Sequence, residues 1–183
     1  MFGNLLSNTL IQHLIDEKGL HIRPFSKKKL QVAQYALGPL AIRYEREDGT
    51  IGICDFRDTK KPYVFQPDEY AVVVVEEHIV LPDGIVGRFI PASGLIERGF
   101  GLTAGKLDPG YGAKGEEIRF GLKNLKSKTN EYTYGSPLAY IEFFDIRGLP
   151  SASTEVRYYD NFIRQLRRGA ELDLRTMDRD DKE

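Results

Sequence analysis

The sequence predicts a mostly β protein that folds as one domain. The chain contains 18 glycines and 9 prolines, and its apolar residues fall in short runs rich in Val, Ile, Tyr and Phe. Short apolar runs separated by turn residues are typical of β-strands joined by tight turns. At 183 residues, the chain is long enough to bury the core of a single domain.

The composition narrows the class of protein. Hydrophobic residues make up 41% and charged residues 29%, which are values of globular rather than disordered chains. The net charge of -1 argues against a general nucleic-acid-binding surface. The sequence shows neither a long apolar run nor a signal peptide, so no membrane association is expected. A single cysteine, Cys54, cannot form an intrachain disulfide, so we expect a cytoplasmic protein, in the host cytoplasm or the virion if a phage encodes it.

The first element expected is an N-terminal helix. Ser7 can cap it, and Gly19 is placed to end it. Its apolar positions are spaced for one face: Leu10, Ile11, Leu14 and Ile15. The basic run Lys27-Lys28-Lys29 follows, and we expect it to be a solvated loop, with phosphate binding as the alternative.

Strands are expected through the middle of the chain. Glu47-Asp48-Gly49 predicts a hairpin turn between Ala41–Tyr44 and Ile51–Cys54. The four valines of Ala71–Val75 favour a strand covered on both faces. Further strand material is expected at 30–46, with a break at Gly38-Pro39, at 78–81 and at 138–146, and 126–130 is expected to be a hairpin loop.

The stretch 81–124 is dense in glycine and carries three motifs. They are Leu81-Pro82-Asp83, Pro91-Ala92-Ser93-Gly94-Leu95 and the run from Thr103 to Tyr111, TAGKLDPGY. In this order and spacing, they resemble the successive motifs of the dCTP deaminase and trimeric dUTPase superfamily. The resemblance implies a dUTPase-like distorted β-barrel or jelly roll, with an N-terminal helix and a C-terminal helical tail. It also implies a homotrimer whose sites lie between subunits and bind dCTP or dUTP.

The resemblance assigns roles to residues of this stretch. Asp108 matches the loop aspartate that contacts the deoxyribose and, in dUTPases, orients the attacking water. Ser93 matches the first serine of the phosphate-binding motif, and Tyr111 matches the aromatic residue after the loop aspartate. Substrate-binding roles are therefore expected for Ser93, Gly94, Thr103, Ala104 and Tyr111, with Asp108 as a catalytic residue.

The match to the family motifs is partial. Ala92 and Glu97 stand where family members carry the two arginines that hold the triphosphate, and Gly121 stands where deaminases carry the proton-carrying glutamate. In an extended strand, Glu117, Arg119 and Gly121 share one face, so Glu117 is the candidate substitute base. Pairing with Arg119 would hold the Glu117 carboxylate ionised and make it a poor base.

The cysteine count decides which metal sites can be expected. Zinc deaminases hold a metal-activated water with a His or Cys and a Pro-Cys-x-x-Cys motif, which a chain with one cysteine cannot supply. We therefore expect no tightly bound cofactor, and Mg²⁺ only together with a nucleotide triphosphate.

Beyond Pro150 the composition changes. We expect one domain over 1–183, with a β core and N-terminal helix in 1–150 and a helix plus charged tail in 151–183. Gln165 and Arg168 lie where family members fold a C-terminal segment over the nucleotide, so the resemblance makes them substrate-binding candidates. The tail from Arg175 to Glu183 is almost wholly charged, and we expect it to dock on an assembly partner or a neighbouring subunit.

Two functions stay open on the sequence. One is a nucleotide enzyme that acts on dCTP or dUTP through Asp108 and Ser93, with Glu117 as base. The other is a non-catalytic homotrimer that keeps the scaffold, for instance as a phage assembly protein or a nucleotide sensor.

Overall fold

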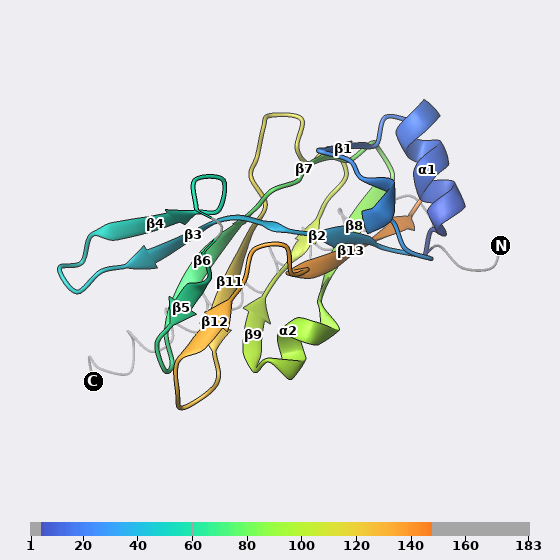
Figure 1. Cartoon of the computed structure of the whole chain (residues 1–183). Helices are drawn as coiled ribbons and strands as arrows, with labels where there is room; N and C mark the ends of the chain where they lie inside the picture. The colour runs from blue at the N-terminus through green and yellow to red at the C-terminus, as the bar shows by residue number, and fades with distance from the viewer. Residues whose placement is uncertain (1–4, 60, 148–183) are drawn as a thin grey trace, which may run out of the picture. The chain divides into compact units, whose positions relative to one another are not determined.

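The computed structural model describes residues 5–59 and 61–147, and these residues form two main antiparallel sheets with a helix near the N-terminus (Figure 1). The elements in chain order are α1 (Asn8–Glu17), β1 (His21–Arg23), the 3₁₀ turn η1 (Lys27–Lys29), β2 (Tyr35–Leu37), β3 (Pro39–Glu45), β4 (Ile51–Asp55), β5 (Tyr63–Phe65), β6 (Tyr70–Val75), β7 (His78–Val80), β8 (Ile85–Pro91), α2 (Ser93–Glu97), β9 (Phe100–Thr103), β10 (Lys106–Leu107), β11 (Arg119–Asn124), β12 (Asn130–Tyr132) and β13 (Ala139–Asp145). The predicted mostly β class with an N-terminal helix is confirmed.

The N-terminal helix begins and ends where the sequence predicts. The Ser7 side chain accepts a hydrogen bond from the backbone N–H of Leu10, at 3.4 Å. Ile11 and Leu14 are buried, whereas Leu10 is exposed. The chain leaves the helix at Gly19, whose φ of +81° lies in the left-handed region that favours glycine.

The strands pair in a mostly non-sequential order. One sheet has the order β10-β8-β13-β2, and the other has the order β4-β3-β6-β11-β9. The β3–β4 hairpin turns at Glu47-Asp48-Gly49, as the sequence predicts, and extends away from the rest of the sheet (Figure 1). Two small two-stranded sheets, β1-β7 and β12-β5, complete the set within the described residues.

The two main sheets face each other across one core. Phe89 of β8 meets Phe120 of β11 edge to face, with ring centroids 4.8 Å apart. Ile141 of β13 and Val73 of β6 are fully buried in the same cluster. Of the four valines, Val73, Val74 and Val75 are buried, and Val72 is half-buried on the outer face of the sheet.

The segment 126–130 differs from the expected hairpin loop. β12 pairs with β5 rather than with β11, so the strands on either side of this loop do not form a hairpin. The buried Asn124 side chain explains the change of direction. Its amide donates to the carbonyl oxygens of Gln66 and Lys128, both at 2.9 Å, and its oxygen accepts from the N–H of Lys126 at 3.0 Å.

Candidate functional site

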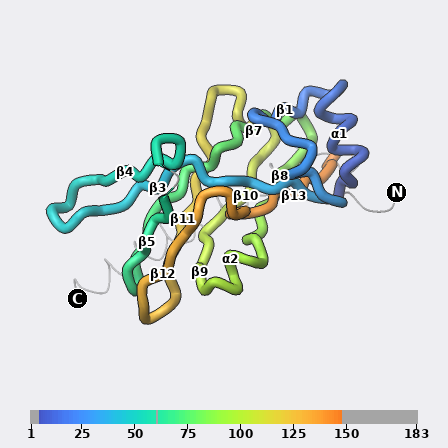
Figure 2. Tube along the Cα trace, viewed as in Figure 1, coloured from blue at the N-terminus to red at the C-terminus, as the bar shows by residue number. Residues whose placement is uncertain are grey.

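The loop that carries Asp108 lies beside β7, on the yellow segment of Figures 1 and 2. Its backbone is fixed by Leu81, whose N–H donates to the Tyr111 carbonyl at 2.9 Å and whose carbonyl accepts from Gly110 at 3.2 Å. The Asp108 side chain is 69% exposed and pairs with Lys106 at 2.7 Å. Burial raises the pKa of the Tyr111 phenol above its ordinary value. This loop holds its carboxylate at the surface, where a ligand can reach it.

The segment around Ser93 is helical rather than extended. Ser93 and Gly94 open α2, so residues 93–97 follow a helix rather than a strand. Ala92 precedes this helix and is only 3% exposed. Arg98, which follows it, donates from Nε to the Gly94 carbonyl at 3.0 Å and lies over the Tyr132 ring, 5.4 Å from its centroid. The Arg98 guanidinium therefore already contacts other groups of the same chain.

Gly121 and Thr103 stand side by side on the outer face of the five-stranded sheet. They are register partners of β11 and β9, so their positions project to the same side. Ala104 follows β9 directly, in the link to β10. This places Thr103 next to the position where the family resemblance expects the proton-carrying glutamate.

Tyr70 fills the space over Gly121. A Cβ atom built on Gly121 would lie 2.2 Å from the Tyr70 hydroxyl oxygen and 2.6 Å from a ring carbon. Tyr70 opens β6, and its register partner is Lys123, two residues along β11 from Gly121. The ring occupies the place of a side chain at residue 121, and 53% of Tyr70 remains exposed. Sequence reasoning missed this residue because the contact depends on the pairing of two strands about 50 residues apart.

Glu117 is held by two arginines on the same outer face. Its Oε2 accepts from Arg119 Nη2 at 2.9 Å and Nε at 3.2 Å, and from Arg43 Nη2 at 3.3 Å. The Arg119 hydrogen bonds, with the nearby Arg43 charge, lower the pKa of the Glu117 carboxyl below its ordinary value. The predicted pairing with Arg119 is present, and Arg43 is a second partner that the sequence did not indicate.

A hollow of about 450 Å³ opens on this outer face beside the two arginines. Its lining residues are Arg43, Tyr44, Glu45, Ile51, Tyr70, Ala71, Val72 and Arg119. A larger hollow of about 710 Å³ lies between the β3–β4 hairpin and β5, but four acidic residues line it: Glu45, Glu47, Asp48 and Glu69. For an anionic ligand, the smaller hollow offers the better charge match.

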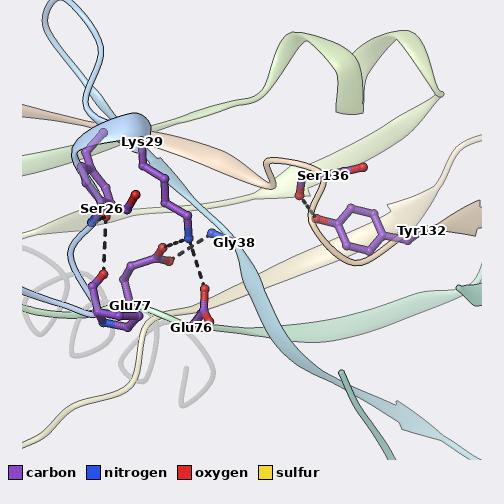
Figure 3. A network of polar contacts seen from close by, with 9 residues as sticks. Ser26, Lys29, Gly38, Glu76, Glu77, Tyr132 and Ser136 are labelled. Atoms are coloured by element: carbon purple, nitrogen blue, oxygen red, sulfur yellow. Dashed lines mark hydrogen bonds and ion pairs between the residues drawn. The ribbon is translucent and has the colours of Figure 1, made fainter. Parts of the chain in front are cut away.

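Lys29 is not the solvated lysine that the basic run suggested. Its ammonium group lies between two carboxylates, at 2.5 Å from Glu77 Oε1 and 3.1 Å from Glu76 Oε2 (Figure 3). The other Glu77 oxygen accepts from the Gly38 N–H at 3.0 Å. Burial opposes the charge on Lys29, but the two carboxylates together outweigh it and raise the lysine pKa. Lys29 therefore balances a buried acid, and its ammonium already has two carboxylate partners.

The predicted site residues fall into three groups. Asp108 and Tyr111 lie in the loop docked on Leu81, Ser93 and Gly94 open α2, and Glu117 and Thr103 flank Gly121 on or beside the outer sheet face. The residues Gln165 and Arg168, like the expected C-terminal helix and charged tail, lie outside the described residues.

Metal and membrane signals are both missing from the described part of the chain. Within 5–59 and 61–147, no group of three or more His, Cys, Asp or Glu residues is arranged to hold a metal ion. The helices of these ranges are also too short or too polar to cross a bilayer.

The comparisons with known proteins agree with one another. Residues 5–146 match the family model described as dCTP deaminase-like. The dCTP deaminase of Pyrococcus furiosus is 30% identical over 131 residues, which cover 72% of this chain and 79% of that protein. The dCTP deaminase of Pyrococcus horikoshii is 29% identical over 133 residues, covering 73% and 80%.

A solved structure supports the fold. The 2'-deoxycytidine 5'-triphosphate deaminase from Agrobacterium tumefaciens superposes with a TM-score of 0.64 at 14% identity. The match covers 88% of this chain and 54% of the other, so this chain spans about half of that protein's length. The family-model match over residues 5–146 and the Pyrococcus furiosus relative lead to one conclusion: this chain belongs to the dCTP deaminase-like family.

Proposed function

We propose that this protein binds a pyrimidine deoxynucleoside triphosphate, dCTP or dUTP, and does not deaminate it. The observation that carries the proposal is the Tyr70 ring, which fills the space over Gly121, the residue that the family resemblance aligns with the proton-carrying glutamate. Deamination of a cytosine ring needs a group that takes a proton from water and delivers it to the ring. A missing general acid–base group costs about 10²–10⁴ in rate.

Glu117 does not take over this role in the proposal. Its carboxylate is committed to Arg119 and Arg43, and its pKa is lowered by them. A carboxylate with a low pKa takes up a proton poorly near pH 7, so it makes a weak general base. Glu117 serves better as a counterion of the two arginines than as a proton carrier.

Binding is supported by the loop that holds Asp108. Its backbone is anchored to Leu81, and its carboxylate is exposed with one lysine partner. The Pyrococcus furiosus and Pyrococcus horikoshii relatives are named dCTP deaminases, and the family resemblance matches Asp108 to the loop aspartate. We assign Asp108 to the deoxyribose, with Thr103, Ala104, Ser93, Gly94 and Tyr111 as further ligand contacts. Mg²⁺ would enter only with the triphosphate.

The test combines ligand-induced stabilisation with product detection. Purified protein is heated with dCTP, dUTP, CTP or dATP, each with Mg²⁺, and ammonia release from dCTP is followed in parallel. A ligand at 100 times its Kd stabilises the folded state by about 2.7 kcal/mol, which raises the Tm measurably. We expect dCTP or dUTP to raise the Tm more than CTP and dATP do, without ammonia release. The substitution Asp108→Asn should reduce the difference in Tm shift between dCTP and CTP, which differ only in the sugar.

Two results would contradict the proposal in different ways. Steady ammonia release from dCTP would show that another residue carries the proton, and Glu117→Gln would then be the first variant to assay. No Tm shift with any nucleotide would instead favour the second candidate function.

That second candidate is a non-catalytic homotrimeric scaffold. The observation in its favour is the α2 region, where Ala92 is buried and Glu97 is acidic in place of the two phosphate-holding arginines that the resemblance expects. Losing one charged hydrogen bond to phosphate costs about 1.5–3 kcal/mol, so a site that relied on this region alone would bind triphosphate weakly. As a scaffold, the protein would use its sheet faces for assembly.

A further inference from the structure

The outer face of the five-stranded sheet gathers two arginines around a single carboxylate oxygen. Arg43 of β3 and Arg119 of β11 come from strands on opposite sides of β6, and both reach Glu117 Oε2. Val72 and Val74 of β6 are the register partners that space the two strands. The pairing of β3 and β11 with β6 brings the two guanidinium groups together, although 76 residues separate them along the chain.

Among the contacts of the described residues, one carboxylate engages only part of the two guanidinium groups. A guanidinium has five N–H donors. In the contacts of the described residues, Arg43 directs one of its nitrogens, Nη2, to Glu117, and Arg119 directs two, Nε and Nη2. Two positive charges thus share one negative charge. A phosphate group, with more oxygens and more charge than a carboxylate, satisfies such a pair better.

The hollow beside the arginines also offers a flat aromatic surface. Tyr70 lines it together with Arg43 and Arg119, and just over half of the tyrosine is exposed. Planar rings stack on exposed tyrosines with a modest gain that does not depend on the exact ring. The volume of about 450 Å³ falls within the range of small-molecule sites. Glu45 also lines the hollow, but it is exposed, so solvent and salt weaken its repulsion of an anion.

We propose that Arg43, Arg119 and Tyr70 form a site for a phosphate-bearing planar ligand, in which Glu117 is the resident counterion that the phosphate displaces. The site would supply the phosphate contacts that Ala92 and Glu97 no longer can. The inference rests on the proposed nucleotide binding for the identity of the ligand, but the phosphate site itself is tested without a nucleotide.

The first arm of the experiment measures pyrophosphate binding by titration calorimetry. Glu117→Gln removes the counterion and should tighten binding about tenfold, the value of one charged hydrogen bond. The matched control is Glu116→Gln, which removes the same charge from the neighbouring residue. The Glu116 carboxylate accepts from the Lys114 N–H and makes no contact with either arginine in the described contacts. Equal effects of the two substitutions would overturn the proposal.

The second arm removes each arginine. Arg43→Gln and Arg119→Gln should each weaken pyrophosphate binding about tenfold in the Glu117→Gln background. The control is Arg57→Gln, because Arg57 is an exposed arginine that pairs with Asp55 instead. Unchanged affinity in both site variants would overturn the proposal, and so would a changed oligomeric mass by light scattering, which would assign the arginines to assembly.

The third arm separates this inference from the proposed function by titrating dCTP and dUTP into the same variants. Nucleotide binding that needs Asp108 but neither arginine would keep the proposed function and overturn the arginine site. Pyrophosphate binding that needs both arginines, with no tighter binding of any nucleotide, would keep the phosphate site and overturn the proposed ligand. Tyr70→Ala should weaken nucleotide binding and leave pyrophosphate binding unchanged, and the reverse pattern would remove Tyr70 from the site.

Discussion

Among the residues that the structure describes, Glu77 carries the most deeply buried carboxylate. It is 1% exposed, and burial raises its pKa because the charged form loses its hydration. Lys29 and the Gly38 N–H compensate for this loss by contacting its two oxygens (Figure 3). These contacts join η1 and the residue between β2 and β3 to the link between β6 and β7. A basic run that looked solvated in sequence therefore has one member with a structural role.

Removing Lys29 should destabilise the protein, because it leaves the buried Glu77 carboxylate without its cationic partner. We expect Lys29→Met to lower the free energy of unfolding by about 2–3 kcal/mol, somewhat less than for a fully buried pair because Lys29 keeps about a third of its surface in water. Lys28→Met, at an exposed neighbouring residue, should change it by less than about 0.5 kcal/mol. Urea unfolding monitored by circular dichroism measures both. Equal losses in the two variants would contradict a specific role for Lys29 and assign the stabilisation to the charge of the whole lysine run.

The same comparison carries a pH signature. The Lys29 pKa is raised above 10.5 in the folded state, so its contribution is fully present below pH 10.5 and is lost as the pH rises through the folded pKa. Above pH 10.5, the difference in unfolding free energy between the wild type and Lys29→Met should shrink as the pH rises. A difference that grows with pH in this range would contradict the assignment of the charge to Lys29.

Ala92 limits what can be restored in the phosphate motif. The residue is 3% exposed and belongs to the core cluster, so an arginine there must bury its charge or displace its neighbours. We expect Ala92→Arg to lower the free energy of unfolding by about 3 kcal/mol or more. Glu97→Arg, at an exposed position of the same helix, should stay within about 0.5 kcal/mol. Comparable stability of the two variants in thermal unfolding would show that residue 92 can turn outward.

At the scale of elements, the loop between β10 and β11 is positioned by a close backbone approach. Gly112 has a φ of +87°, and a Cβ atom there would lie 1.9 Å from the carbonyl oxygen of Ile79 in β7. Gly110 has a similar φ of +82°, but a Cβ atom there would meet nothing within 4 Å. Two glycines of one loop thus share a backbone conformation and differ in their surroundings.

This difference predicts unequal costs for alanine. Gly110→Ala should cost about 1–2 kcal/mol, the strain of a left-handed residue with a side chain. Gly112→Ala adds a backbone clash, so we expect a further loss of about 1–3 kcal/mol and a loop displaced from Leu81. Thermal unfolding gives the stabilities, and amide exchange of the Leu81 N–H, which donates to Tyr111, reports the position of the loop. Similar values for both variants would show that the loop does not depend on this contact.

Local sequence signals predicted individual elements well but not their partners. The Ser7 cap, Gly19 and the Glu47-Asp48-Gly49 turn act over a few residues, and all three lie where the sequence placed them. We expected β12 to pair with β11, but it pairs with β5. The sequence did not reveal this partner because a pairing between distant strands leaves no local pattern. The site shows the same limit, since the Arg119–Glu117 pair was predictable from spacing and the Tyr70–Gly121 contact was not.

At the scale of the whole molecule, the outer face of the five-stranded sheet is a candidate surface for assembly, judged from the described residues. The valines of β6 and the aromatic residues of β13 are apolar, but most do not offer surface for an interface. Val73, Val74, Val75 and Phe143 are buried within the chain. Exposed apolar side chains of the outer face are instead those of Ile51 and Ile53 in β4, each more than 60% exposed, and of Tyr70. Among the strands of residues 5–59 and 61–147, β4 also lies at the edge of its sheet, where backbone groups of one side are available for pairing.

We therefore expect a homotrimer of about three times 20.8 kDa, with ligand sites at the subunit boundaries. Light scattering at micromolar concentration measures the mass directly. Ile53→Lys places a charge in the middle of the apolar edge and should shift the protein toward monomer, because burying that charge without a partner is costly. Val32→Lys is the matched control, since Val32 is 80% exposed in a loop and should leave the mass unchanged. A wild-type monomer would refute the trimer. A trimer that resists Ile53→Lys would move the interface away from β4, to a face where that isoleucine stays in water.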